Sequence, residues 1–412
     1  MRAGHFQSRP CSMTGPLTLP EFLICYQQTY NNVMPKTNIL KYYVDALGED
    51  VMIEALAKTR REMASRSPRA ERKISPVTNP IMRFMIQTVE LRDGKLHQNF
   101  RTSVLDENQY VYFNVTGGAL RLVSEEVKDN SGYINELKRG MLGIDIGGAL
   151  SDLNELISGA FYKQLGHRIS FANGHGKPDV DILGTQYATD AKLFPGGRIQ
   201  LQAALNESRT LIPEVFSNQS AGDVIVFIRT PDKKSIHASL KKLLAHIEDN
   251  PEERFKDDSI GVLAIPNHYQ AGDLTIRFLP QDFRVHFQAV WPMDKAVDLL
   301  KQQIIQSIKQ SQRVNKRAIT WVFVPDDAKK HAIQSSALRF AAGFHQFVES
   351  QSQEGLQQVV VYSVVPTREG NKIGASISTD VYGHPVKDIL ITRDTVHAFL
   401  GNLLKTAEII IP

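Results

Sequence analysis

The 412-residue chain has only two cysteines, Cys11 and Cys25, and no long stretch of apolar residues. Two cysteines cannot form the disulfide network that holds small secreted domains together, so we expect a reducing, cytoplasmic setting. No run approaches the roughly 18 apolar residues that a membrane-spanning helix needs. The first 24 residues also lack the basic start and apolar stretch of a signal peptide. These absences predict a cytoplasmic protein that does not cross a membrane.

The sequence lacks both a zinc-binding motif and a nucleotide-binding loop, and its positive and negative charges are nearly balanced. The spacing of His and Cys fits no zinc site. No Gly-x-x-x-x-Gly-Lys-Ser/Thr loop is present, which argues against an ATP-driven motor. The chain has 48 Lys and Arg against 44 Asp and Glu. That balance neither requires nor excludes nucleic acid as a partner, because a basic stripe can lie within a balanced total.

The N-terminal part of the chain predicts a tail followed by a helical and then a β region. Residues 1–18 are polar and irregular, which predicts a disordered tail. Residues 19–140 form the next region. It is helical from about 19 to 63, and strands are expected between 80 and 123. Within those strands Asp93-Gly94 is a strong signal for a hairpin turn.

The pattern of apolar residues changes at residues 148–230, where the expected elements follow in the order α-β-β-β-α-β. These elements are a helix at 149–165, strands at 168–172, 179–183 and 186–194, a helix at 198–216 and a strand at 223–228. Residues 231–412 continue as a C-terminal α/β region with alternating helices and strands. The predicted fold class is therefore mixed α/β, and whether the C-terminal region is continuous with the 148–230 core stays open.

Charged residues gather on the second and third expected strands of this core. Because side chains of a strand alternate between its faces, Asp179 and Asp181 point one way. For the same reason Asp190 and Lys192 share a face of the next strand. If the strands pair, three carboxylates and one ammonium meet, which is unfavourable unless a cation binds among them. Hard oxygen ligands of this kind suit Mg²⁺ or Mn²⁺.

This set contains the parts that hydrolysis of a phosphodiester bond requires. The reaction needs a deprotonated water and compensation for the charge that grows on the phosphate oxygens. A metal held by Asp179 and Asp190 supplies both. Lys192 beside it is expected to stabilise the pentavalent state or to help position and deprotonate the water. The backbone carbonyl of Ala191 is a further expected ligand, and Asp181 completes the acidic set.

Pro178-Asp179 followed by Asp190-Ala191-Lys192, within this order of elements, resembles the PD-(D/E)xK nuclease superfamily. The resemblance covers residues 148–230. It implies a restriction-endonuclease-like core, Mg²⁺ or Mn²⁺ as cofactor and cleavage of nucleic acid, with DNA as the expected substrate. An acidic residue on the first helix often adds a metal ligand in this family. The resemblance therefore implies Glu155 as a ligand, with Asp152 as the second choice. Restriction or defence against foreign DNA is a setting in which the family recurs.

The same residue types occur elsewhere in the chain and have simpler interpretations. Glu126-Val127-Lys128 and Glu136-Leu137-Lys138 match the short half of the motif, but their polar surroundings favour a solvated surface. Pro325-Asp326 opens an expected helix, where an aspartate is an ordinary cap. For residues 178–192 the alternative is a surface hairpin with paired charges. For the whole protein it is a non-catalytic nucleic-acid-binding or structural module with the same fold.

Two basic segments, 58–73 and 301–317, are candidates for binding phosphate. A solvated helix face is the simpler interpretation of such charge runs, and it is the one we favour for each. If the nuclease site is real, the residues expected to bind nucleic acid are Lys177, Arg313, Lys316 and Arg317. A protein partner or a homodimer also stays open.

Overall fold

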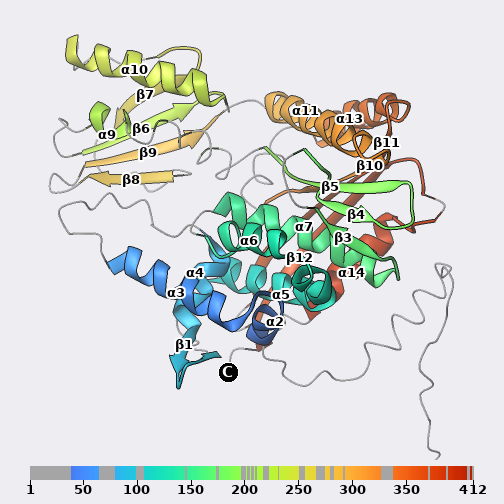
Figure 1. Cartoon of the computed structure of the whole chain (residues 1–412). Coiled ribbons are helices and arrows are strands. Elements are labelled where there is room, and N and C mark those ends of the chain that lie inside the picture. Colours follow the sequence, from blue (N-terminus) through green and yellow to red (C-terminus); the bar gives the residue numbers. More distant parts are fainter. Residues whose placement is uncertain are drawn as a thin grey trace, which may run out of the picture.

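The protein is a mixed α/β structure, seen here in a computed structural model (Figure 1). The structure describes residues 39–64, 79–98, 106–143, 146–172, 176–195, 201, 205, 208, 211–216, 222–230, 232–249, 256–265, 274–278, 283–290, 293–325, 337–369, 372–386, 388–405 and 409–410. The expected disordered tail at 1–18 and most of the basic segment 58–73 lie outside these residues.

A seven-stranded sheet with the strand order β13-β12-β11-β10-β5-β4-β3 organises most of the described chain. Its strands are β3 (Ile169–Phe171), β4 (Val180–Ile182), β5 (Tyr187–Leu193), β10 (Arg317–Phe323), β11 (Leu356–Glu369), β12 (Lys372–Gly383) and β13 (Ile409–Ile410). The neighbours β3, β4 and β5 pair antiparallel, whereas β10 is parallel to both β5 and β11. The three strands expected at 168–194 are therefore confirmed.

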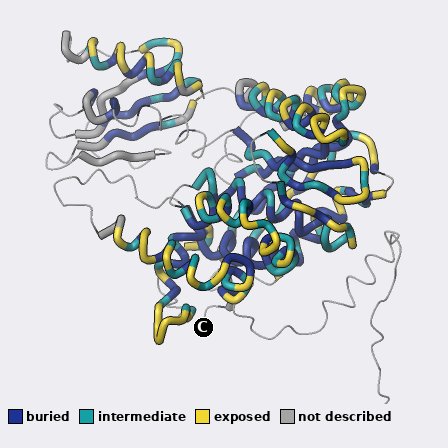
Figure 2. The backbone as a smooth tube through the Cα atoms, viewed as in Figure 1, coloured by how far each residue is buried: buried dark blue, intermediate teal, exposed yellow. Residues whose placement is uncertain are grey.

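Helices cover both faces of this sheet because its central strands alternate between two cores (Figures 1 and 2). On β10, Trp321 packs into the core that includes α5 (Glu107–Lys128), α7 (Ile146–Gln164) and α14 (Arg393–Lys405). Its neighbour Val322 faces the other way, into the core with α11 (Met293–Gln312) and α13 (Ala337–Gln351). Apolar residues on both faces are typical of a strand buried between two helical layers.

The N-terminal region is more helical than its sequence predicts. The helices α2 (Ile39–Leu47) and α3 (Glu49–Ala64) are confirmed, as is the hairpin of β1 (Val89–Arg92) and β2 (Lys95–Gln98). Asp93 and Gly94 have φ of 50° and 75°, the left-handed values that a tight hairpin turn requires. The strand expected before this hairpin is instead α4 (Pro80–Thr88), whose start is marked by the cap Asn79 and a proline at the first turn.

Two of the strands expected between 80 and 123, at 110–115 and 119–123, are wrong, because both segments lie within α5, which is helical apart from a kink at Val123. Aromatic and β-branched residues favoured strands, but Tyr110 and Phe113 are buried, as are most of their neighbours on the helix. A helix that is buried on nearly all sides loses the amphipathic period by which it is recognised. Asp106, whose carboxylate accepts a hydrogen bond from the Gln109 N–H, was the available sign of its start.

The expected boundary of the core at 148–230 is also wrong. The apolar strand at 223–228 is β6 (Gly222–Ile228), which belongs to a separate four-stranded sheet. In that sheet the strand order is β7 (Ile260–Ile265), β6, β9 (Phe283–Ala289) and β8 (Leu274–Phe278), so β6 pairs with β7 and β9. The helices α9 (Leu211–Phe216) and α10 (Lys233–Asp249) accompany this sheet. The place beside β5 is taken by β10 instead. The C-terminal region is therefore continuous with the core sheet.

The side chain of Asn79 joins three segments, so it offers a test of how the N-terminal helices are held. Its Oδ1 accepts hydrogen bonds from the N–H groups of Ile81 and Met82. Its Nδ2 donates to the carbonyls of Met141, at 2.6 Å, and Gly143, at 2.8 Å. We expect Asn79→Ala to lower the free energy of unfolding by about 2–4 kcal/mol, since it removes a cap and strands buried polar groups.

Urea unfolding measures this loss, and Asn79→Ser is the matched control. The serine hydroxyl can still cap α4 but is too short to donate to either carbonyl, so the stability of this variant should lie between those of the wild type and the alanine variant. Equal stability of all three proteins would show that Asn79 does not join these segments.

Candidate functional site

The elements α7, β4 and β5 bring together the charged residues that the sequence singled out. Asp190 and Lys192 lie on β5, and Lys192 Nζ is 2.8 Å from Asp190 Oδ1. Asp179 lies just before β4, and its Oδ2 accepts a hydrogen bond of 2.7 Å from the N–H of Ala191. Glu155, on α7, is close enough to interact electrostatically with the Asp190 and Lys192 charges. The expected meeting of Asp179, Asp190 and Lys192 is therefore present.

Burial makes Asp179 expensive to ionise, beside a second buried carboxylate, Asp190. The side chain of Asp190 is fully buried. Among the described residues its oxygens have no hydrogen-bond donor apart from the Lys192 ammonium and, if it is protonated, Asp179. Burial, and next the nearby charges of Glu155 and Asp190, raise the pKa of Asp179 well above its usual range. These carboxylates therefore need protons or a cation near them.

Lys192 remains a cation in this setting. Burial alone would lower the pKa of its ammonium, but the carboxylates of Asp190, Asp179 and Glu155 outweigh burial and raise it. A protonated lysine stabilises negative charge and orients a water, but it cannot accept a proton. The geometry thus favours Lys192 as an electrostatic group, one of the roles that its position in the sequence predicted.

Glu155 titrates near neutral pH. Burial, and next the charge of Glu136, raise the pKa of its carboxyl from 4.5 to about 7, and Asp190 adds to the rise. Lys192 opposes these effects. A bound cation would favour the ionised form of the Glu155 carboxyl, which is consistent with the role of metal ligand that the resemblance implied.

Two residues of α6 (Ser131–Arg139) near this acidic set were missed in the sequence. The ring of Tyr133 is buried and stacks on Phe171, with centroids 4.3 Å apart. Burial and then Glu155 raise the pKa of its phenol, so the hydroxyl lies in the field of the acids. Glu136, which was assigned to solvated surface, is the nearby charge that most affects Glu155. Their i, i+3 spacing puts them on one helix face, which was the available signal.

Asp152, the second choice for a ligand on α7, has a structural role instead. Its Oδ2 accepts a hydrogen bond of 2.5 Å from the N–H of Met141 in the turn between α6 and α7. Its side chain is buried, and burial raises its pKa well above the usual range. Asp152 therefore fixes the entry to α7.

Asp181 does not join the other acids, so its assignment as a metal ligand is wrong. Its carboxylate pairs with Lys316, whose Nζ also donates to the carbonyl of Ile182 at 3.0 Å. The alternation argument failed because β4 begins at Val180. Asp179 therefore precedes the strand, and the regular two-residue alternation does not relate it to Asp181.

The same interactions correct two of the four residues expected to bind nucleic acid. Lys316 is committed to Asp181, and the guanidinium of Arg317 donates to the Ser352 carbonyl at 2.9 Å. Lys177 and Arg313 are exposed, and Arg313 Nη1 donates to the Gly176 carbonyl at 3.1 Å. That bond holds the end of α11 against the segment that leads into Asp179, so Arg313 lies beside the residue that precedes Lys177.

The first basic segment gives less support to a phosphate-binding role. Within its described part, Arg60 Nη2 donates to the Val89 carbonyl at 2.6 Å, so it joins α3 to the N-terminal hairpin. Lys58 is exposed. Arg61 is exposed as well, and residues 65–73, which carry the remaining four basic side chains, lie outside the described residues.

The donors at this site suit Mg²⁺ better than a metal that needs a complete protein cage. In the described part of the chain, no three His, Cys, Asp or Glu side chains are grouped closely enough to hold an ion. Mg²⁺ keeps several waters and is usually bound by one or two carboxylates together with substrate phosphates. Asp179 and Asp190 provide those carboxylates, and the Asp190 oxygens have free lone pairs to offer a cation.

The carbonyl of Ala191 faces the same edge of β5 as its N–H, because the two groups of one strand residue point to the same neighbour. That N–H bonds to Asp179, so the carbonyl is also directed toward the Asp179 side of β5. This geometry supports the expected role of Ala191 as a backbone ligand.

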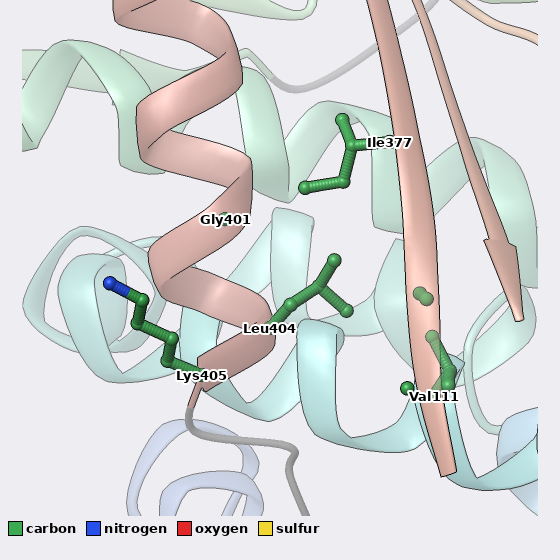
Figure 3. A pocket seen from close by; sticks show the side chains of 7 residues that line it. Val111, Ile377, Gly401, Leu404 and Lys405 are labelled. Atoms are coloured by element: carbon green, nitrogen blue, oxygen red, sulfur yellow. The ribbon is translucent and has the colours of Figure 1, made fainter. Parts of the chain in front are cut away.

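A cavity of about 190 Å³ lies elsewhere, between α5, β12 and α14. It is lined by Val111, Gly374, Ala375, Ile377, Gly401, Leu404 and Lys405. Figure 3 shows Leu404 and Ile377 projecting into the space between α14 and β12. Apart from Lys405 the lining carries no titratable or nucleophilic side chain, so this cavity offers no catalytic chemistry comparable to that of the acidic cluster.

Comparisons with known protein families, curated proteins and solved structures find no match to this chain. Among the described residues, no helix is long and apolar enough to cross a membrane.

The raised pKa of Glu155 predicts how the metal-free protein responds to pH. Below pH 4.5 Glu155 is protonated in both the folded and the unfolded chain. Between pH 4.5 and about 7 the unfolded chain loses this proton first, so stability falls, and the cost is constant at higher pH. Glu155→Gln should therefore raise the Tm at pH 8 relative to wild type and reduce the fall between pH 5 and pH 8.

Calorimetry in the presence of a chelator tests this expectation. Glu354→Gln removes an exposed acid and is the control, because it should leave the pH dependence unchanged. A Glu155→Gln variant whose Tm falls with pH as steeply as that of wild type would contradict the electrostatic description of the site.

Proposed function

We propose that this chain is a metal-dependent nuclease of the PD-(D/E)xK type that hydrolyses phosphodiester bonds, with DNA as its substrate. The observation that carries the proposal is the cluster of Asp179, Asp190 and Lys192, with Glu155 near enough to interact electrostatically. These are the residues that the motif requires, and they come from the elements on which the motif places them.

The order of elements supports the same proposal once the four-stranded unit is treated as an insertion. Without it, the chain runs α7-β3-β4-β5-α11-β10. The strands β3, β4 and β5 pair antiparallel, β10 is parallel to β5, and α11 packs on both. This order agrees with the αβββαβ arrangement expected of a restriction-endonuclease-like core and so supports the proposal, with β10 in the place that the sequence had given to 223–228.

Asp179, Asp190 and the Ala191 carbonyl would hold Mg²⁺ or Mn²⁺, and Glu155 would complete the set. When bound, the metal supplies an acidified water and compensates charge on the phosphate. Asp190 holds the ammonium of Lys192 at 2.8 Å, so this cation is fixed beside the reacting phosphate. Ala191 N–H fixes the second oxygen of Asp179 and thereby its orientation.

Substrate affinity must come from cations outside the acidic cluster, because the cluster itself repels a phosphate backbone. Lys177, Lys309 and Arg313 are exposed. Lys309 and Arg313 lie one turn apart at the end of α11, and Arg313 bonds to Gly176 beside Lys177. We assign these three residues to the phosphate backbone in place of Lys316 and Arg317.

The alternative is a non-catalytic binding or structural module with the same fold. Such a module gains nothing from burying several mutually repelling carboxylates, which costs stability without a cation. That cost favours the enzyme. A cytoplasmic setting, a role in restriction or defence, and a protein partner or homodimer are further parts of the proposal that rest on the sequence alone.

Substitution of the central pair tests the proposal. Asp190→Asn should abolish cleavage of plasmid DNA while the folded structure remains. Lys192→Met should also abolish cleavage, at a cost in stability, because it leaves the buried Asp190 without its compensating charge. Mg²⁺ and Mn²⁺ should support cleavage, and Ca²⁺ should permit binding with little turnover, because it acidifies bound water poorly.

Asp181→Asn is the matched control, because Asp181 lies on the neighbouring strand and pairs with Lys316 instead of the cluster. It should cleave at close to the wild-type rate. Cleavage that persists in EDTA, or that survives Asp190→Asn, would refute the proposed mechanism.

A second test concerns the basic surface. Changing Lys177, Lys309 and Arg313 together to glutamine should weaken DNA binding by a similar factor for all sequences. The slope of log affinity against log salt should also become shallower, by up to about 0.9 for each phosphate that is no longer neutralised.

The control replaces the exposed Lys41, Lys95 and Lys128 with glutamine, which changes the net charge by the same amount elsewhere. Equal effects of the two triple variants would show that only overall charge matters and that another surface holds the substrate.

A further inference from the structure

We propose that Asn154 is a positioning residue that fixes α7, with Glu155, against β5, with Asp190 and Lys192. This inference rests on the proposed nuclease function. It assigns a role to a buried amide that the metal-binding and phosphate-binding residues do not account for.

The side chain of Asn154 is fully buried and uses all its hydrogen-bonding groups within the protein. Its Nδ2 donates to the backbone carbonyl of Lys192 at 3.0 Å and to that of Trp321 at 3.1 Å. Its Oδ1 accepts a hydrogen bond of 2.8 Å from the hydroxyl of Tyr362. One side chain therefore joins α7 to β5, β10 and β11.

These bonds leave the amide a single orientation. A flipped amide would direct Oδ1 at the carbonyl oxygens of Lys192 and Trp321, which cannot donate, so both bonds would be broken. The hydroxyl of the buried Tyr362 donates to Asn154 Oδ1 and so stabilises this orientation of the amide.

Both ends of this link are next to functional groups. On the helix, Asn154 immediately precedes Glu155. On the strand, it holds the carbonyl of Lys192, the residue that follows the proposed ligand Ala191. A shift of α7 along β5 would therefore change the separation between Glu155 and the other acids. Outer groups that orient metal ligands in this way typically contribute about 10–100-fold to metal affinity or activity.

A comparable link at the same interface provides a control that lacks the connection to Glu155 and to the strand backbone. Two turns further along α7, the buried Tyr162 hydroxyl accepts hydrogen bonds from Thr189 Oγ1 at 2.7 Å and Trp321 Nε1 at 2.9 Å. It joins the same helix to β5 and β10. Although Thr189 precedes Asp190, Tyr162 bonds only side chains, and its helix neighbours are not ligands. Tyr162→Phe thus measures what removing a buried tether costs in stability alone.

The variants to compare are Asn154→Leu, Tyr362→Phe and Tyr162→Phe in the full chain. Asn154→Leu removes the tether at similar volume. Tyr362→Phe leaves both donors of Asn154 and removes only the hydroxyl that orients it, so it provides a second, milder test if the leucine variant is poorly folded. We expect Mn²⁺ affinity, measured by calorimetry, to fall by about tenfold or more in Asn154→Leu and by less in Tyr362→Phe.

Amide hydrogen exchange gives a readout that needs no metal. The N–H of Ala191 bonds to Asp179 and should exchange faster in both variants, whereas Tyr162→Phe should leave it, and the Mn²⁺ affinity, at wild-type values after correction for stability. Should the Asn154 and Tyr362 variants match Tyr162→Phe in both measurements, the positioning role is overturned while the nuclease proposal stands. A wild-type protein that neither binds Mn²⁺ nor cleaves DNA would refute the nuclease proposal itself, and the inference with it.

Discussion

The buried ion pair between Lys192 and Asp190 is the interaction on which the site depends. A fully buried carboxylate is tolerated only when an opposite charge or donors compensate it. Here one ammonium at 2.8 Å compensates Asp190, while Asp179 and Glu155 add negative charge that this single cation cannot balance. Burial, together with this shortage of positive charge, raises the carboxyl pKa values of Asp179 and Glu155 and favours a cation at the cluster.

Repelling charges remain close together only if the elements that carry them cannot move apart. The interface between α7 and the sheet provides this rigidity through buried polar links at Asn154 and Tyr162, each with donors and acceptors matched. Such networks stabilise a single arrangement when fully satisfied, because any shift breaks several bonds in a medium where water cannot replace them. Local repulsion at the site is therefore offset by specific packing beneath it.

The sequence could predict the parts of the site that depend on short-range geometry. Asp190 and Lys192 share a face because side chains alternate along a strand, and a short hairpin brings Asp179 to them. Asp181 was misjudged because β4 begins at Val180, one residue after Asp179, so alternation along the strand does not relate these two side chains. The role of β10 depends on packing between distant segments, which no local pattern encodes. Strands were likewise predicted within α5 because a buried helix and a buried strand have similar compositions, rich in aromatic and β-branched residues.

The four-stranded unit separates β5 from α11 and β10 in the sequence, although these elements lie together in the large sheet and its helical layer. The four-stranded unit has a hydrophobic core of its own, formed by described residues between Leu201 and Phe287, and none of them belongs to the two cores of the large sheet. A unit that buries its own apolar surface adds little constraint to the strands on either side of it. The chain can therefore leave after β5 and return at α11, and β10 still pairs with β5 along its whole length. Because pairing in a parallel sheet needs a long connection in any case, this junction is where an added domain disturbs the site least.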